Sequence, residues 1–390
     1  MKIIHIIGTL NKAGIQKYIL ELSRTPELIK YDFQVLCSFK SQDNYKDEYL
    51  KNNFTIKYLP FTYLPTHWLP FRLDKLFRNL FKKLYIFRLW FVLVKSDINI
   101  VHTHIHCHIV SQILASVLSG KRIIWTIHGE YSLSKITIWL VRILDAILSR
   151  IKFHIIADSK PAILSTLPYF IKKLNTDDII PTGINLELFN QQYDKSLIRR
   201  KYNITGDEVL IGSTGRIVWQ KGFDQLIKLL VKHTFSKKQI RFLIAGDGSL
   251  RNSYIQKIKD LGLVNQISFI GNIKNIPEFL ASLDFYIQPS VTEGFPLSVL
   301  EAMASGLPVL CSDAGGLKDM IQNGYNGVLY ESNNLNSLYS GITDLLSMSK
   351  DELFVLGKNA SNTVQNNYSI QNSALKYESR YNINKRVKTS

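Results

Sequence analysis

The chain has 390 residues, of which 46% are hydrophobic and 20% are charged, with 21 glycines and 11 prolines. This length predicts two domains or three, and the composition excludes disordered, collagen-like and coiled-coil chains. The three cysteines, Cys37, Cys107 and Cys311, are too few and too scattered for a disulfide framework or a four-ligand zinc site, and they fit a reducing compartment.

The first predicted element is a strand over residues 2–7, followed by a glycine-containing loop over 8–14 and a helix over 15–23. The apolar start includes His5 and is too short for a secretory signal peptide. The longest apolar stretch, residues 84–94, includes Arg88 and is too short to span a bilayer. We therefore expect a cytoplasmic protein without a membrane-spanning helix.

The formal net charge is +17, and the excess of positive charge leans toward the first half. Such a field attracts nucleic acids, phosphorylated metabolites or an anionic membrane surface. The strongest local bias lies in residues 71–90, where basic and aromatic side chains alternate around a single acid, Asp74. Apolar residues recur there at helical spacing and predict a basic amphipathic helix. They are Leu73, Phe77, Leu80, Phe81 and Leu84.

This helix has two interpretations, and the sequence favours neither. It could lie in the headgroup region of an anionic membrane, or it could be an ordinary helix with a core face and a solvated basic face. Nucleic acid is not an expected partner, because no recognition motif accompanies the charge. The membrane interpretation predicts that the protein sediments with anionic liposomes at low salt.

Further along the chain, short apolar strands alternate with helices. Near-continuous apolar strands of this kind indicate parallel sheets covered on both faces, so the predicted fold class is α/β with two doubly wound, Rossmann-like domains. Helices are predicted over 223–233, 250–261, 296–304 and 371–381. Strands are predicted over 33–38, 98–102, 122–127, 154–157, 209–214, 240–245, 267–270, 285–288 and 308–311.

The second half carries an ordered set of motifs that name a family. They are the segments 215–222 (GRIVWQKG), 245–248 (AGDG), 269–271 (FIG), 289–296 (PSVTEGFP), 301–309 (EAMASGLPV) and 313–316 (DAGG). The first half adds its opening strand and loop, the pair His128-Gly129 and the segment 180–184 (IPTGI). Together these motifs resemble the family 4 glycosyltransferases, which are retaining enzymes of the GT-B fold.

This resemblance implies two Rossmann-like domains facing across a cleft. It assigns residues 1–190 to an acceptor-binding domain and 191–369 to a nucleotide-sugar-binding domain. A C-terminal helix, about residues 370–390, is expected to pack back on the first domain. The implied reaction transfers a sugar from a UDP- or GDP-sugar to a hydroxyl acceptor.

Arg216 and Lys221 follow a predicted strand end and lie on one loop. Open α/β sheets bind ligands beyond the carboxyl ends of their strands. The two cations could hold the donor's diphosphate and stabilise the charge that grows as the glycosidic bond breaks. The alternative is two solvated surface cations.

Two acids flank the predicted start of the 296–304 helix. The resemblance assigns Glu293 to the hydroxyls of the donor sugar and Glu301 to those of the ribose; the alternative is that both acids cap the helix or are solvated. The positive end of the helix suits anionic groups, and proline suits a first helical turn. The donor-binding residues expected there are Gly294, Phe295, Pro296 and Leu297.

In the first half the resemblance implies a two-glycine loop that approaches the donor phosphate. Ala13 stands where glycine is commoner, whereas Gly14 keeps the position of close approach. His128 matches a family histidine near the reacting sugar and the acceptor, where it could donate a hydrogen bond or orient the acceptor. A purely structural role for His128 is the alternative.

Four histidines alternate along one segment: His102, His104, His106 and His108. In an extended chain they would share a face. The first two end a predicted strand, where polar residues lining the ligand edge are expected, so we predict no metal site. No Asp-any-Asp motif occurs, and no metal or cofactor is expected besides the donor substrate.

The expected reaction needs no pair of carboxylates at glycosidase separation, because the leaving phosphate would help to deprotonate the acceptor. Domain closure would exclude water and limit hydrolysis. The basic, aromatic first domain suggests a glycan or lipid-linked glycan acceptor at the inner membrane face, as in capsule, lipopolysaccharide or exopolysaccharide assembly. The alternatives are a nucleotide-sugar epimerase on the same fold and a non-catalytic glycosyltransferase-like subunit.

Overall fold

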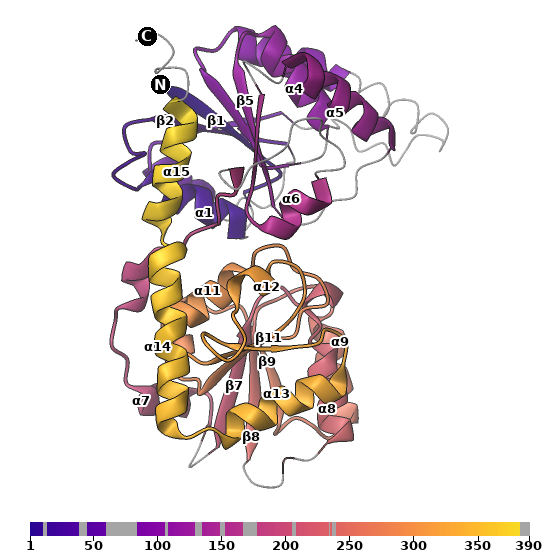
Figure 1. Ribbon diagram of the computed structural model, residues 1–390, viewed down its shortest axis with the longest axis vertical. Helices are drawn as coiled ribbons and strands as arrows, with labels where there is room; N and C mark the ends of the chain where they lie inside the picture. Colours follow the sequence, from indigo (N-terminus) through magenta and orange to yellow (C-terminus); the bar gives the residue numbers. More distant parts are fainter. Residues whose placement is uncertain are drawn as a thin grey trace. The chain divides into compact units, whose positions relative to one another are not determined.

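The chain forms two compact units, each with its own sheet (Figure 1). In this computed structural model the described residues are 1–10, 14–38, 45–59, 84–105, 108–128, 135–148, 153–166, 178–204, 208–233, 235 and 239–382. The first unit comprises Met1–Pro181 and Ile370–Ser390, and the second comprises Thr182–Ser369. The sequence placed this boundary after residue 190, whereas the structure divides the chain at Pro181.

The first unit is built on six parallel strands in the order β3-β2-β1-β4-β5-β6. The predicted strands are confirmed, with ends shifted by up to two residues, and β3 is an addition. That strand is short, lies at the sheet edge and is only half-buried, so it lacks the apolar run that identifies the others. The strands are β1 (Lys2–Ile7), β2 (Asp32–Cys37), β3 (Thr55–Tyr58), β4 (Ile100–Thr103), β5 (Arg122–Ile127) and β6 (Phe153–Ala157).

Alternation along each strand divides the first core into two layers. Ile3 and Ile7 of β1 pack on the layer under α1 and α15, whereas Ile4 and Ile6 pack on the opposite layer. The first layer is covered by α1 (Gly14–Ser23), α2 (Lys46–Lys51) and α15 (Ile370–Asn382). The second is covered by the helix over 84–94, α4 (Ile109–Leu118), α5 (Lys135–Leu148) and α6 (Lys160–Thr166).

The last helix, α15, is an integral part of the first unit. Its Tyr377 and Tyr381 are almost fully buried in the layer that also holds α1. The Arg122 guanidinium donates hydrogen bonds of 2.9 Å to the carbonyls of Arg380 and Tyr381, which closes the C-terminal end of the helix. The chain therefore returns to its first sheet after completing the second.

The second unit repeats the architecture with the order β12-β11-β10-β7-β8-β9. The predicted strands are again confirmed, and the three-residue edge strand β12 is the addition. In both sheets the first and fourth strands of the unit are neighbours, which makes β1–β4 and β7–β10 the topological switch points. The strands are β7 (Val209–Thr214), β8 (Ile240–Ala245), β9 (Ile267–Gly271), β10 (Phe285–Gln288), β11 (Val309–Ser312) and β12 (Val328–Tyr330).

Helices cover both faces of the second sheet. One face carries α8 (Asp224–Lys232), α9 (Arg251–Asp260) and α13 (Leu335–Ser347). The other carries α10 (Ile276–Ala281), α11 (Leu297–Ala304), α12 (Leu317–Met320) and most of α14 (Lys350–Asn367), with α7 (Lys195–Lys201) beside α10. Within the described residues of this unit, 3-10 helices lie at Leu186–Phe189 and Trp219–Lys221.

The predicted basic amphipathic helix is described only in part, since residues 60–83 lie outside the described ranges. Over 84–94 the buried face is Tyr85, Leu89 and Leu93. Leu84, expected on the core face, is instead 40% exposed, so the predicted apolar stripe is wrong at this end. Among the helices in the described ranges, none combines the length and apolarity needed to cross a bilayer.

Candidate functional site

In the second unit, glycines allow the loops at the carboxyl edge of the sheet to touch through their backbones. Gly246 follows β8 with φ +143°, and a Cβ there would lie 1.8 Å from the carbonyl oxygen of Gly215. Gly222 has φ +65°, and a Cβ there would lie 1.9 Å from the carbonyl oxygen of Pro289. Side chains at these positions would force the loops apart, so the glycines hold this edge in a defined shape.

Lys221 and Glu293 meet at this edge. The Lys221 Nζ lies 2.6 Å from Oε2 of Glu293, and the two side chains are only 14% and 12% exposed. Ser290 Oγ donates a hydrogen bond of 2.9 Å to the same carboxylate oxygen. In the described part of the chain, no group donates to Oε1 of Glu293. The pair is therefore fixed on one side and has an open acceptor oxygen on the other.

A series of buried hydrogen bonds leads from the sheet to Glu293. Gln288 Nε2 donates to Ser290 Oγ at 2.8 Å, and Tyr286 Oη donates to Gln288 Oε1 at 3.1 Å. The amide of Thr214 donates in turn to Tyr286 Oη at 3.1 Å, which ties β10 to β7 at the switch point. Burial raises the pKa of Tyr286, so its hydroxyl stays neutral and can donate. Gln288 and Ser290 were not among the predicted site residues, although they are polar residues at the end of a predicted buried strand.

The two other charged candidates lie on the same unit. Arg216 directly follows Gly215 on the loop that carries Lys221; its side chain is exposed, and none of the described acids pairs with it. Glu301 is half-buried on α11 and is engaged with neighbouring groups. The structure thus brings Lys221 and Glu293 into direct contact and leaves the Arg216 guanidinium available.

The start of α11 differs slightly from the prediction. The helix begins at Leu297, and Pro296 is its N-cap, with ψ 108°, rather than a member of the first turn. Pro296 is buried, whereas Gly294, Phe295 and Leu297 are half-buried. The amides of these three residues donate to no acceptor in the described ranges. They lie at the positive end of the helix and suit an anionic group.

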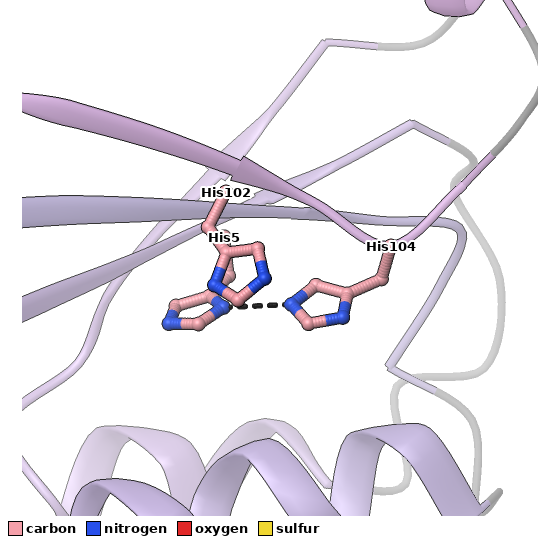
Figure 2. Close-up of side chains that lie close together, drawn as sticks. All are labelled: His5, His102 and His104. Carbon is pink, nitrogen blue, oxygen red and sulfur yellow. Dashed lines mark hydrogen bonds between the residues drawn. The ribbon is translucent and has the colours of Figure 1, made fainter. Parts of the chain in front are cut away.

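In the first unit, His128 directly follows β5 and belongs to a buried line of side chains. Its Nδ1 lies 3.2 Å from Oδ2 of Asp158, and its Nε2 lies 3.0 Å from Nδ1 of His104. The Nε2 of His104 lies 2.9 Å from Nδ1 of His5, and a dashed line marks this hydrogen bond in Figure 2. Gly14 is the exposed first residue of α1, whereas Ala13 and Gly129 lie outside the described residues.

The segment that carries the four alternating histidines does not stay extended as far as His108. His108 is the N-cap of α4 with φ 57°, so the segment turns into a helix, and His106 lies outside the described residues. The neighbour of His102 is instead His5, directly opposite on β1. Period-two alternation along the predicted strands could have placed His5 and Asp158 on the same face as His104. It could not have shown that they are neighbours, because that depends on the register between strands.

Burial keeps these imidazoles neutral. It lowers the pKa of His5 to about 3. It also holds the pKa values of His102 and His104 well below the ordinary value, with a smaller contribution from the neighbouring histidines. The Nδ1 of His102 lies 2.8 Å from Tyr381 Oη, and its Nε2 lies 2.7 Å from Thr126 Oγ1. His102 therefore connects β4 to α15 and β5.

Two family models match the chain in succession. The model described as Glycosyltransferase Family 4 matches residues 13–188, and the one described as Glycosyl transferases group 1 matches residues 194–363. A galactosyltransferase of Escherichia coli, UDP-Gal:alpha-D-GlcNAc-diphosphoundecaprenol alpha-1,3-galactosyltransferase, is 26% identical over 295 residues, or 72% of this chain and 74% of the relative. An uncharacterized glycosyltransferase of Methanocaldococcus jannaschii is 31% identical over 210 residues, 53% of each chain.

Solved structures resemble the whole chain. A glycosyltransferase from Rickettsia africae superposes with a TM-score of 0.80 at 22% identity, covering 100% of this chain and 99% of the other. Anabaena HepE in complex with UDP and glucose superposes with a TM-score of 0.77 at 18% identity, covering 98% and 99%. At these identities the likeness establishes the fold.

Proposed function

Because this chain belongs to the family 4 glycosyltransferases and has the GT-B fold, we propose that it transfers a sugar from a UDP- or GDP-sugar to a hydroxyl acceptor with retention of configuration. The main support is the Lys221–Glu293 contact at the switch point of the second sheet, beside the unpaired amides that begin α11. A nucleotide-sugar presents a diphosphate and several hydroxyls, and this edge offers cations and amides for the first and a carboxylate oxygen for the second.

The charges suggest a division of roles at the donor. The Arg216 guanidinium can bind the diphosphate, and the Lys221 ammonium has three donors, so it can contact a phosphate oxygen while it holds Glu293. Both cations then stabilise the charge that develops on the leaving group. Oε1 of Glu293 is suited to a hydroxyl of the donor sugar, and we assign Glu301 to the ribose.

The remaining assignments concern the first unit and the proton. We assign Gly14, at the exposed start of α1, to close approach by the donor phosphate, and His128 to the reacting sugar or the acceptor. The leaving phosphate takes the acceptor proton, so the reaction as proposed uses no second carboxylate and no metal or other cofactor. The cationic side chains supply the charge stabilisation that a metal ion would otherwise provide.

Donor binding tests the site directly. We expect a thermal-shift screen against UDP, GDP, ADP and their sugars to identify one stabilising base. For that donor, Arg216→Ala should raise the Kd about 10- to 100-fold by loss of a charge-assisted contact. Arg200→Ala, an exposed arginine on α7, serves as the control and should leave the Kd unchanged. Equal affinities for wild type, Arg216→Ala and Glu293→Gln would remove the proposed site.

Product analysis tests the reaction. With donor alone, the proposed enzyme should release free sugar slowly or leave the donor intact. With a suitable glycan or lipid-linked acceptor it should form a glycoside of the donor's own anomeric configuration. An isomeric nucleotide-sugar would identify an epimerase instead, and donor binding without any product across an acceptor panel would favour a non-catalytic subunit.

We further propose that the acceptor is a glycan or lipid-linked glycan of cell-surface polysaccharide assembly, reached at the inner face of the membrane. The E. coli relative is named for a diphosphoundecaprenol-linked acceptor. The helix over 84–94 and α5, which cover the same face of the first sheet, expose large apolar side chains. These side chains are Leu84, Phe87, Trp90, Phe91 and Val94, with Ile136, Trp139 and Ile143 on α5. The net charge of +17 also attracts anionic lipid.

Liposome sedimentation tests this membrane contact. Phe87 is 64% exposed and Trp139 is 61% exposed, so Phe87→Ser with Trp139→Ser should weaken binding to vesicles that contain phosphatidylglycerol. Phe354→Ser, at a site 70% exposed on α14 of the second unit, is the matched control and should bind like wild type. Binding that is equal in all variants, or indifferent to salt, would reject the proposed surface.

A further inference from the structure

Four neighbouring strands of the first sheet contribute to one hydrogen-bonded line. His5 lies in β1, and His104, His128 and Asp158 follow β4, β5 and β6 at their carboxyl ends. By alternation with the strand residues that pack under α1 and α15, all four side chains point to that face. The line therefore runs across the sheet, with contacts of 2.9 Å, 3.0 Å and 3.2 Å from His5 to Asp158.

A metal ion is the first alternative, because nitrogen atoms of His5, His102 and His104 lie within 4.8 Å of one another. The contacts argue against it. Both ring nitrogens of His102 bond to hydroxyls, and both ring nitrogens of His104 bond to histidines. A metal would have to displace at least two of these hydrogen bonds in a site that is almost fully buried. The existing partners account for the cluster without an ion.

The direction of the hydrogen bonds follows from the carboxylate. An ionised Asp158 can only accept, so Nδ1 of His128 carries a hydrogen. When His128 is neutral, its Nε2 is an acceptor, and Nδ1 of His104 must donate to it. His104 is itself neutral, so its Nε2 accepts from Nδ1 of His5. One carboxylate thus selects the Nδ1–H tautomer in three successive rings.

We propose that His104, supported by His5, is a positioning residue that holds His128 in the Nδ1–H tautomer with its Nε2 lone pair occupied. In this arrangement neither ring nitrogen of His128 is free to contact a substrate hydroxyl. Contact through Nε2 requires the bond to His104 to open, so His104 controls when that nitrogen becomes available. Only this catalytic consequence rests on the proposed function; the tautomers do not.

Two substitutions, His104→Asn and His104→Gln, test the two hydrogen bonds of His104 one at a time. The amide nitrogen of asparagine lies near the place of Nδ1, so His104→Asn can still donate to His128. The amide of glutamine reaches the place of Nε2, so His104→Gln keeps the contact with His5 and loses the one with His128. Unfolding temperatures of both variants, compared with wild type, identify any variant that fails to fold.

Imidazole ¹⁵N NMR of the full chain gives the decisive readout. We expect His5, His104 and His128 to show protonated Nδ1 and unprotonated Nε2 at pH 7. His104→Asn should preserve the ¹⁵N signals of His128, whereas His104→Gln should change the chemical shift of the His128 Nε2. Nε2–H tautomers in these rings, or a His128 spectrum that is the same in both variants as in wild type, would overturn the inference.

A zinc titration followed by the same NMR signals tests the metal alternative. One equivalent of Zn²⁺ should leave the imidazole signals unchanged; saturable shifts of His5, His102 and His104 would identify a metal site and also overturn the inference.

Turnover supplies a second readout. Because His104→Gln removes one of the two contacts that orient the His128 ring, it should lower kcat about tenfold with little change in KM. His104→Asn keeps that contact and should stay within about twofold of wild type. Equal kcat values in the two variants would reject the positioning role. If the NMR result holds and no variant transfers sugar, the proposed function fails and the tautomer assignment stands.

Discussion

The two units share a strand order but differ in the chemistry at the carboxyl edge of the sheet. In the first unit the switch point between β1 and β4 carries buried, neutral imidazoles that hydrogen-bond to other histidines and to hydroxyl groups. In the second, the switch point between β7 and β10 leads to an ammonium–carboxylate pair, with glycines packing the loops together. The shared topology brings loops together at the switch point of each sheet, and the side chains on these loops determine whether the groups there are neutral or charged.

Acid should distinguish the units most strongly. In the unfolded chain histidines protonate near pH 6.5, whereas burial lowers the pKa of His5 to about 3 and those of His102 and His104 well below the ordinary value. Between these limits the unfolded state binds more protons, so stability falls as pH falls. At pH 5 the burial of His5 should cost the first unit about 2 kcal/mol relative to pH 7, and His102 and His104 should lower its stability in the same direction.

Urea unfolding at pH 7, 6 and 5, read by pulsed hydrogen exchange, reports the two units separately. The second unit contains a single histidine, His233, and serves as the internal control. His5→Asn should reduce the loss in the first unit. Parallel losses in both units would contradict the assignment of neutral buried histidines.

The close backbone contacts of the second unit should give the next largest effect on stability. Gly246→Ala places a methyl group against the Gly215 carbonyl and should destabilise the second unit by about 3 kcal/mol or more. Gly262→Ala is the matched control in the same unit: its φ is +67°, but no atom lies within 4 Å of the new Cβ. It should cost only about 1 kcal/mol. Similar unfolding temperatures for the two variants would show that the loops can separate freely.

The charged pair gives an effect of intermediate size. Lys221→Met leaves the Glu293 carboxylate largely buried with Ser290 as its remaining donor, and it should cost about 2 kcal/mol of stability and about 100-fold in kcat. Adding Glu293→Gln should recover much of the stability and none of the activity. Denaturant unfolding and turnover of the two single variants and the double variant measure this coupling. Recovered activity in the double variant would exclude a role for the pair in catalysis.

The smallest effect is expected at Ser290. Its loss in Ser290→Ala removes one donor to Glu293 and leaves the buried Gln288 amide without its acceptor, at a cost of about 1 kcal/mol. Donor Kd should change by less than it does for Glu293→Gln. Ser305→Ala, which removes a hydroxyl that donates to the Glu301 carbonyl one turn earlier, is the control for loss of a serine hydroxyl. An equal response of the two variants would remove Ser290 from the site.

The amino-acid sequence determined the strands, the fold class and the charged candidates of the second unit, because buried parallel strands are continuous apolar runs and Arg216, Lys221 and Glu293 stand in loops directly after them. It did not reveal the edge strands β3 and β12, which have only four and three residues and are too short to carry a pattern. The tertiary structure alone decided the contact of Lys221 with Glu293, 72 positions apart, and of His5 with His104, 99 positions apart. Such contacts depend on strand order and register, which a local sequence pattern does not contain.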